Sequence, residues 1–440
     1  MALSVGSYLL KSGSVVTMDT ADRVYESGAV LMENGLLTYV GSVDGCPPSA
    51  GARVIDISES IVIPGLINAH CHSPMTFMRG LAENCQPAEW FRRTELLRQA
   101  LTDEDIYWSS LLGCCEMLLN GITCVADRYS RMEIASEAIL SSGIRASLGP
   151  SIFDAGFAGG GFETLEMAQK LVERFGTSGD RRVSSGLAPI GLDTSSTELL
   201  KATRDVAELL EARIYIHVAQ SREELEVAAQ RGHRGSVRYL DSIGLLGPNV
   251  VAAHCIYIDP EEVRLLADAG VHVAHCPASN AKIEARVAPV GLLRETGVNL
   301  ALGTDCAASN NTNDLFRELH IAGLLHRVQS QDPIGPSGRD LMAMVTRDAA
   351  RALGLERWTG SLEIGKRADV TVIGGRHLRL QPAHDAFTRL AYAASGADVS
   401  HVFVDGELLV DNGRLTRHEQ DDLLARVRSW QQRTAGAVTS

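Results

Sequence analysis

Long hydrophobic runs are absent from this 440-residue sequence. No stretch of about eighteen apolar residues, the length that crosses a bilayer, occurs anywhere. The N-terminus, "MALSVGSYLLKSGSVVTMD", lacks the apolar core, basic flank and small-residue cleavage site of a secretory leader. We therefore expect no membrane partner and a cytoplasmic location.

Clusters of positive charge and closely spaced cysteine pairs are also missing. The chain has 41 Lys and Arg against 54 Asp and Glu, a net charge of -13, whereas a nucleic-acid partner requires clustered Lys and Arg. Its nine cysteines are an odd number without CxxC spacing, which argues against a zinc ribbon or a redox pair. We expect reduced, mostly buried thiols and a small-molecule partner.

A change of rhythm along the chain predicts the fold. Residues 5–62 form short β-like runs, and from residue 64 to 364 apolar strands alternate with amphipathic helices, as in "RIYIHVAQ" followed by "SREELEVAAQRG". Repeated βα units favour an α/β fold, a (β/α)₈ TIM barrel. A doubly wound open sheet is the alternative, but no glycine-rich dinucleotide loop follows the first strand.

The β character of the N-terminus returns after residue 364, in "ADVTVIGG" and "SHVFVDGELLVDNGRLT". Two β-rich ends that flank a barrel suggest that they pair with each other. We predict a composite β domain made of residues 1–63 and 365–440, and a barrel domain of residues 64–364.

Metal-ligating side chains recur where the predicted strands end. His70 and His72 in "GLINAHCH" are two residues apart, so in a strand they point to the same face. Strand ends in a barrel meet at one mouth, and four further strands end in His217, His254, His275 and Asp305. Each residue alone suits an ordinary structural role, which we keep for His275. Together the others are a donor set favoured by zinc or ferrous iron.

Three motifs, "PGLINAHCHSPM", "HCPASNAKI" and "LGTDCAASNN", resemble the amidohydrolase superfamily. The similarity is to the branch that contains atrazine chlorohydrolase, guanine deaminase and the S-adenosylhomocysteine/methylthioadenosine deaminases, and it extends over essentially the whole chain. It implies a distorted (β/α)₈ barrel, a small β-sandwich built from both termini, and assembly as a homo-oligomer.

The same resemblance implies one divalent metal, Zn²⁺ or Fe²⁺, held by four ligands: His70, His72, His217 and Asp305. His254 would contact water or substrate, and Asp305 would take the proton of the water that the metal activates. Binuclear members use a carboxylated lysine after the fourth strand, and "VSSGLAPIGLDT" contains none. We therefore expect a mononuclear site.

The sequence departs from the family pattern on the substrate side. Gln220 in "HVAQ" replaces the glutamate that protonates a ring nitrogen in deaminases, and an amide has no exchangeable acid proton near neutral pH. Leu187 in "GLAPI" stands where adenosyl-processing deaminases carry a substrate-binding histidine. Three interpretations of Gln220 remain: a substrate that needs no ring protonation, a different acid, or a substitution introduced into or accumulated by an impaired enzyme.

Other substrate contacts are less specific. Glu89 and Trp90 lie in "LAENCQPAEWFRRT", which resembles a lid segment of the family, although Trp90 also suits a packed core. Asn280 in "SNAK" is a candidate contact or a loop-forming residue.

These observations predict a mononuclear metal-dependent hydrolase that cleaves a C–N bond of a small heterocyclic molecule through metal-bound hydroxide. The preferred substrate is an exocyclic amide. The alternative is deamination of an aminated heterocycle such as methylthioadenosine, S-adenosylhomocysteine, guanine, a pterin or a triazine. A catalytically impaired small-molecule-binding barrel is the hypothesis of another class, and the complete donor set argues against it.

Overall fold

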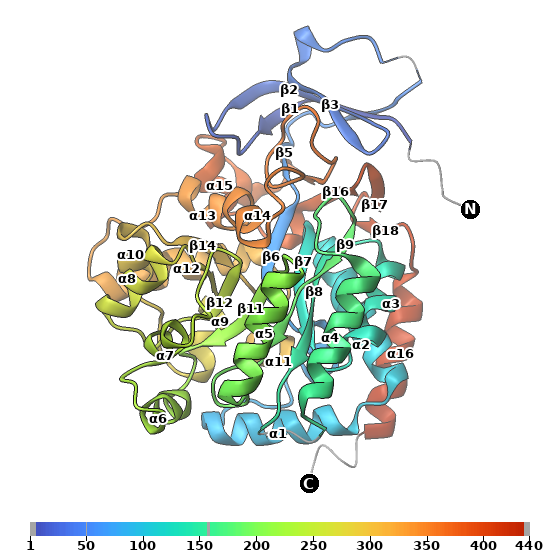
Figure 1. Cartoon of the computed structure of the whole chain (residues 1–440). Helices are drawn as coiled ribbons and strands as arrows, with labels where there is room; N and C mark the ends of the chain where they lie inside the picture. The colour runs from blue at the N-terminus through green and yellow to red at the C-terminus, as the bar shows by residue number, and fades with distance from the viewer. Residues whose placement is uncertain (1–5, 50, 156–158, 435–440) are drawn as a thin grey trace.

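The computed structural model describes residues 6–49, 51–155 and 159–434 (Figure 1). Its centre holds two parallel sheets whose strands follow the chain order. The first sheet contains β6 (Leu66–Cys71), β7 (Ile122–Tyr129), β8 (Arg145–Ile152), β9 (Val183–Ser185) and β10 (Ala188–Pro189). The second contains β11 (Ile214–Val218), β12 (Val250–His254), β13 (His272–His275) and β14 (Asn299–Leu302).

Single parallel bridges connect the two sheets at both of their edges. Leu187 pairs with Ile214 on one side, and Cys71 pairs with Asp305 on the other. Because β9 and β10 both pair with β8, they share one strand position. The arrangement is that of a distorted TIM barrel, as the sequence predicted, in which isolated bridges replace a continuous ladder at two seams.

Helices surround these sheets and follow the strands in the expected alternation. The described helices of this part are α1 (Pro87–Ala100), α2 (Asp103–Leu119), α3 (Met132–Ser142), α4 (Phe162–Phe175), α5 (Thr197–Leu209), α6 (Arg222–Gln230), α7 (Ser236–Ser242), α8 (Pro260–Asp268), α9 (Pro277–Ile283), α10 (Val290–Glu295), α11 (Ala307–Asn310), α12 (Leu315–Ser330), α13 (Gly338–Met344) and α14 (Arg347–Leu353). Thr102 and Asp259 begin α2 and α8 with reciprocal capping boxes, which satisfy exposed backbone N–H groups.

Both ends of the chain contribute to a separate nine-stranded sheet, whose N-terminal strands are seen at the top of Figure 1. Its strands are β1 (Tyr8–Val16), β2 (Val24–Glu33), β3 (Leu36–Ser42), β4 (Arg53–Asp56), β5 (Ile61–Pro64), β15 (Val370–Ile373), β16 (Val399–Val404), β17 (Glu407–Asp411) and β18 (Arg414–Leu415). The antiparallel pairing of β5 with β15 joins the N-terminal strands to the C-terminal ones. The N-terminal and C-terminal β-rich segments, which the sequence predicted to pair, therefore form one sheet in the structure.

Two helices follow β15. They are α15 (Ala386–Tyr392) and α16 (Gln420–Thr434). Helix α16 packs against α2, and its Trp430 ring lies 5.0 Å from the Phe77 ring, centroid to centroid. The C-terminal helix therefore covers the barrel rather than the nine-stranded sheet (Figure 1). No helix among the described residues is both long and apolar enough to span a membrane.

Side chains along the barrel strands point alternately into the barrel and toward the helices, and small side chains fill the barrel interior. Cys124, Ala126, Ala253, Ala274 and Ala301 belong to one buried cluster, whereas the larger core lies between the strands and the helices. Since side chains alternate along a strand, Arg128 at the end of β7 continues the inward-facing series of Cys124 and Ala126. We call the end of the barrel where the strands terminate the mouth. The barrel interior is thus polar at the mouth and apolar away from it.

Candidate metal centre and substrate pocket

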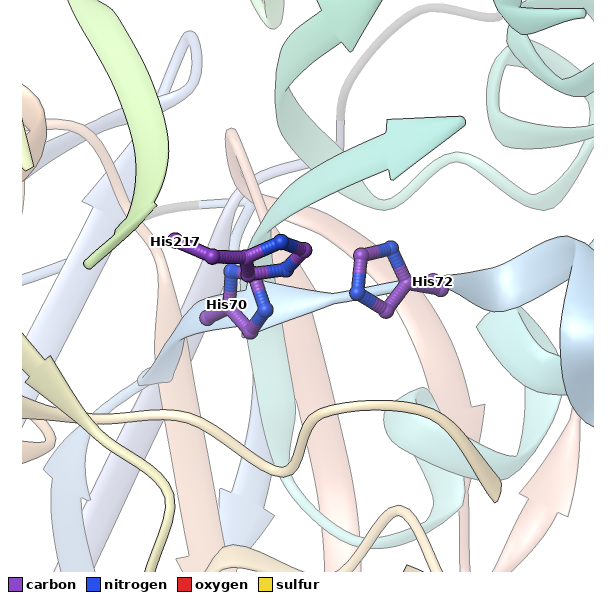
Figure 2. Close-up of side chains that lie close together, drawn as sticks. All are labelled: His70, His72 and His217. Atoms are coloured by element: carbon purple, nitrogen blue, oxygen red, sulfur yellow. The ribbon is translucent and has the colours of Figure 1, made fainter. Parts of the chain in front are cut away.

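The imidazoles that sequence placed at the strand ends lie together at the barrel mouth. The ring centroid of His70 lies 4.8 Å from that of His72, 5.0 Å from that of His217 and 5.4 Å from that of His254. Figure 2 shows His70, His72 and His217 side by side. In two groups, His70 with His72 and His217, and His70 with His254 and Asp305, the donor atoms all lie within 4.8 Å of one another.

Irregular backbone geometry produces this convergence. Pairing between β6 and β7 is interrupted between Asn68 and Cys71, next to His70. His254 and Asp305 have φ angles of 73° and 57°, in the left-handed region that non-glycine residues seldom adopt. Backbone strain of this kind concentrates at functional sites, where the surrounding fold enforces it.

Each donor is oriented by a second contact. His72 donates from Nδ1 to the backbone carbonyl of Arg128 at 2.7 Å, which leaves Nε2 as the free donor atom, 3.2 Å from Asp305 Oδ1. The other Asp305 oxygen, Oδ2, accepts hydrogen bonds from the hydroxyls of Ser279 at 2.6 Å and Ser309 at 3.0 Å. Contacts of this kind fix the orientation of metal ligands.

Asn280 orients His254. The His254 ring donates from Nδ1 to Asn280 Oδ1 at 2.8 Å, so its Nε2 lone pair faces away from that contact. The sequence left Asn280 between a substrate contact and a loop role. The structure gives it a contact with His254, and Asn280 is not among the residues that line the pocket.

Burial keeps the imidazoles of His70, His217 and His254 neutral, whereas neighbouring groups keep the Asp305 carboxylate ionised. Burial, and then neighbouring positive groups, lower the pKa values of His70 and His217 well below 6.5, and burial lowers that of His254. For Asp305, burial alone would raise the pKa, but the close contact with His72 and the other surrounding imidazoles hold it well below 3.8. These are the protonation states that metal coordination requires.

The donor set fits a divalent cation. His70 Nε2 and His254 Nε2 are buried and have no hydrogen-bond partner among the described residues. An unsatisfied buried nitrogen is costly unless a ligand occupies it. Three imidazoles with one carboxylate are the donors preferred by zinc and related metals.

Above the donors lies a pocket of about 520 Å³. His72, His217 and Asp305 form its floor, and residues of α1 including Trp90 form part of its wall. Trp90 is buried, and its indole N–H donates to the Ala308 carbonyl at 3.5 Å. The pocket is of the size that small-molecule sites have.

Gln220 also lines this pocket, as its replacement of a catalytic acid implied. Its backbone N–H and that of Ala219 donate to the two carboxylate oxygens of Glu224, at 2.9 and 2.8 Å. Burial, and then the charge of Asp193, raises the pKa of Glu224 to about 7. Glu224 therefore fixes the backbone that presents Gln220.

Two candidate substrate residues lie elsewhere. Glu89 is on the outer side of α1, where it forms ion pairs with Arg92 and Arg93, and it is not part of the pocket lining. Leu187 is fully buried in the hydrophobic core. A motif position fixes the element on which a residue lies, but not the direction of its side chain, and this is why both placements differ from the expectation.

Arg128 was missed by the sequence analysis, which searched strand ends only for His, Asp and Glu. Its guanidinium lines the pocket, with Nη1 2.8 Å from Nε2 and 3.0 Å from Nδ1 of His217. Nη1 thus contacts both ring nitrogens of His217. His275, kept in a structural role, is in neither donor group.

A family model described as the amidohydrolase family matches residues 61–409. The chain is 36% identical over 423 residues to a 5-methylthioadenosine/S-adenosylhomocysteine deaminase of Symbiobacterium thermophilum, covering 96% of this chain and 97% of that protein. The chain belongs to the amidohydrolase family. It is a hydrolase that acts on C–N bonds.

Solved structures agree with this assignment. A zinc-bound adenosine deaminase from Xanthomonas campestris superposes with a TM-score of 0.93 at 29% identity, covering 98% of this chain and 99% of that one. Atrazine chlorohydrolase from Arthrobacter aurescens, complexed with zinc, gives 0.89 at 26% identity, with 96% and 99% coverage. These zinc-containing neighbours and the histidine-rich donor set support a divalent metal ion in this amidohydrolase.

Proposed function

We propose that this amidohydrolase is a mononuclear enzyme that hydrolyses the exocyclic C–N bond of a small nitrogen heterocycle. The observation that carries the proposal is the gathering of His70, His72, His217 and Asp305 at the floor of a pocket, in two donor groups that share His70. We propose zinc as the resident ion, with iron as the alternative, because four mixed nitrogen and oxygen donors suit both.

A bound divalent ion would supply Lewis acidity, which lowers the pKa of water to about 7. The protein's own groups do the rest. Asp305 is ionised and held through Oδ2 by two serine hydroxyls, so it can accept a proton and return it to the leaving nitrogen. His254, held neutral and oriented by Asn280, can hydrogen-bond to the reacting oxygen.

Two leaving groups remain candidates. Loss of ammonia from an aminated ring fits the names of the relatives, which are deaminases of adenosine derivatives. Hydrolysis of an exocyclic amide, the preferred sequence prediction, is favoured by Gln220, because its side chain lines the pocket without an acidic proton. A cytoplasmic location and homo-oligomeric assembly stay predictions.

A paired screen separates these reactions. Metal-analysed protein is incubated with adenosyl, guanine, pterin and triazine amines, with ammonia as the readout, and with N-acyl and heteroaryl amides, analysed by mass spectrometry. Ammonia release supports deamination, and amide cleavage without ammonia supports the second candidate. No hydrolysis of either panel by fully metal-loaded protein would contradict the proposal.

Gln220→Glu sharpens the result. We expect this variant to fold, because the carboxylate is nearly isosteric with the amide, and to gain ring deamination because an acid is restored at the pocket wall. If the wild type already deaminates methylthioadenosine rapidly, the inferred importance of Gln220 is wrong.

A further inference from the structure

Arg128 is a buried cation that the chemistry proposed above does not use. It lies at the end of β7, is 4% exposed and lines the pocket beside His217. The Nε atom is buried and has no hydrogen-bond partner among the described residues. Within the described part of the chain, the side-chain hydrogen bonds of its guanidinium go from Nη1 to the His217 ring.

No carboxylate in the described part of the chain lies within ion-pair distance of Arg128. Removing an arginine from water without a close counter-ion is costly. The fold therefore keeps a positive charge at this wall without supplying the negative group that would normally accompany it.

Arg145 on the neighbouring strand shows what a structural arginine looks like in this protein. It is 1% exposed, and it donates from Nε and Nη2 to the two oxygens of Asp369 at 2.7 and 3.1 Å. Asp405 is a second carboxylate partner, and Nη1 donates to a backbone carbonyl at 3.0 Å. Arg145 and Arg128 are buried to a similar extent, but only Arg145 has carboxylate counter-ions. The two residues therefore have different roles.

Arg128 borders the pocket of about 520 Å³, which has room for a ligand group. The hydroxyl-bearing residues Ser130, Ser151 and Thr194 line the same pocket. A guanidinium together with hydroxyls is a suitable environment for a planar oxyanion.

We propose that Arg128 recognises a carboxylate carried by the substrate, so that the enzyme acts on anionic heterocycles rather than on neutral nucleosides. The inference rests on the proposed function for the position of the reacting bond, but the binding itself needs no turnover. The Nε and Nη2 atoms of the guanidinium would each donate a hydrogen bond to one carboxylate oxygen. Nη1 would keep its contact with the His217 ring. Arg128 is thus a specificity-determining residue.

The test compares pyrimidine-4-carboxylate with the neutral, nearly isosteric pyrimidine-4-carboxamide by isothermal titration calorimetry. Wild-type protein should bind the carboxylate at least about tenfold more tightly, a ratio typical of one added charge-assisted contact. Arg128→Met should remove most of that preference, and Arg128→Lys should retain part of it. Because a bound metal also attracts carboxylates, the readout is the difference between wild type and Arg128→Met, measured with and without metal.

Arg98→Met is the matched control. Arg98 lines the same pocket but already forms an ion pair with Glu95 at 2.6 Å, so its removal should leave the carboxylate preference unchanged. Equal affinity for both probes, no binding of either probe, or a preference that survives in Arg128→Met would overturn the inference. Failure of the C–N hydrolase proposal would instead show as absence of turnover with intact probe binding.

Discussion

Arg145 and Arg128 lie on neighbouring strands at opposite ends of the barrel, and both are almost completely buried. At the end opposite the mouth, Arg145 is fully engaged by Asp369 and Asp405, which couple the barrel to the nine-stranded sheet. At the mouth, Arg128 Nε, His70 Nε2 and His254 Nε2 have no partner among the described residues. The comparison of the two arginines teaches that a buried cation with carboxylate partners ties two parts of the chain together, whereas one without them is left open toward the pocket.

Substitution of a metal donor should have the largest effect on activity. Asp305→Asn and His217→Ala each remove a ligand, and we expect losses of metal affinity beyond the roughly 10–100-fold typical of outer contacts. Folding should survive, because both side chains lie at the floor of the pocket and belong to none of the hydrophobic core clusters. Turnover and bound metal of each variant check this, and full activity in both would contradict the ligand assignment.

Loss of Arg145 should act on stability instead. Arg145→Met leaves Asp369 and Asp405 without their shared cation, and breaking a buried pair in this way costs about 3–5 kcal/mol. Urea unfolding of the variant measures the loss. Arg128→Met is the control at the mouth and should cost much less, because no carboxylate depends on it at close range. Equal losses of unfolding free energy in Arg145→Met and Arg128→Met would contradict the contrast between the mouth and the opposite end of the barrel.

Glu224 gives the mouth a pH-dependent contribution to stability. Its folded pKa of about 7 lies above the ordinary value of 4.5, so between these pH values the folded state holds a proton that the unfolded chain releases. The contribution of this group to stability therefore falls as pH rises through that window. Glu224→Gln lacks this dependence. Urea unfolding from pH 4.5 to 8 should therefore show that the free energy of unfolding of the variant rises relative to that of the wild type. Parallel profiles would contradict the raised pKa.

Glu89→Ala should have the smallest effect. Glu89 faces solvent and its ion pairs with Arg92 and Arg93 are exposed, so they are screened by water. We expect turnover within about twofold of wild type, as for substitutions away from functional contacts. Steady-state kinetics check this. A large rise in KM would mean that α1 rearranges to bring Glu89 into the pocket.

Sequence patterns predicted the parts that depend on strand and helix periodicity. The βα alternation gave the barrel, and the strand ends gave His70, His72, His217, His254 and Asp305, which the structure brings together. The left-handed backbone at His254 and Asp305, which aims these side chains, has no signal in a single sequence.

The substrate wall was predicted less well for physical reasons. Glu89 and Leu187 were assigned through motif position, yet the ion pairs of Glu89 with Arg92 and Arg93 and the packing of Leu187 into the core decide where they point. Arg128 is a strand-end residue that the same search would have found if it had included cations. Gln220 was placed correctly because it is three residues after a strand-end histidine, on the turn that Glu224 fixes.

Metal stoichiometry tests the central claim most directly. Metal-free protein is titrated with Zn²⁺ by calorimetry, and the bound metal is then quantified by mass spectrometry. The account predicts one tightly bound ion per chain in the wild type and no comparable binding in His217→Ala. Two ions per chain, or equal binding by wild type and His217→Ala, would contradict a mononuclear site formed by His70, His72, His217 and Asp305.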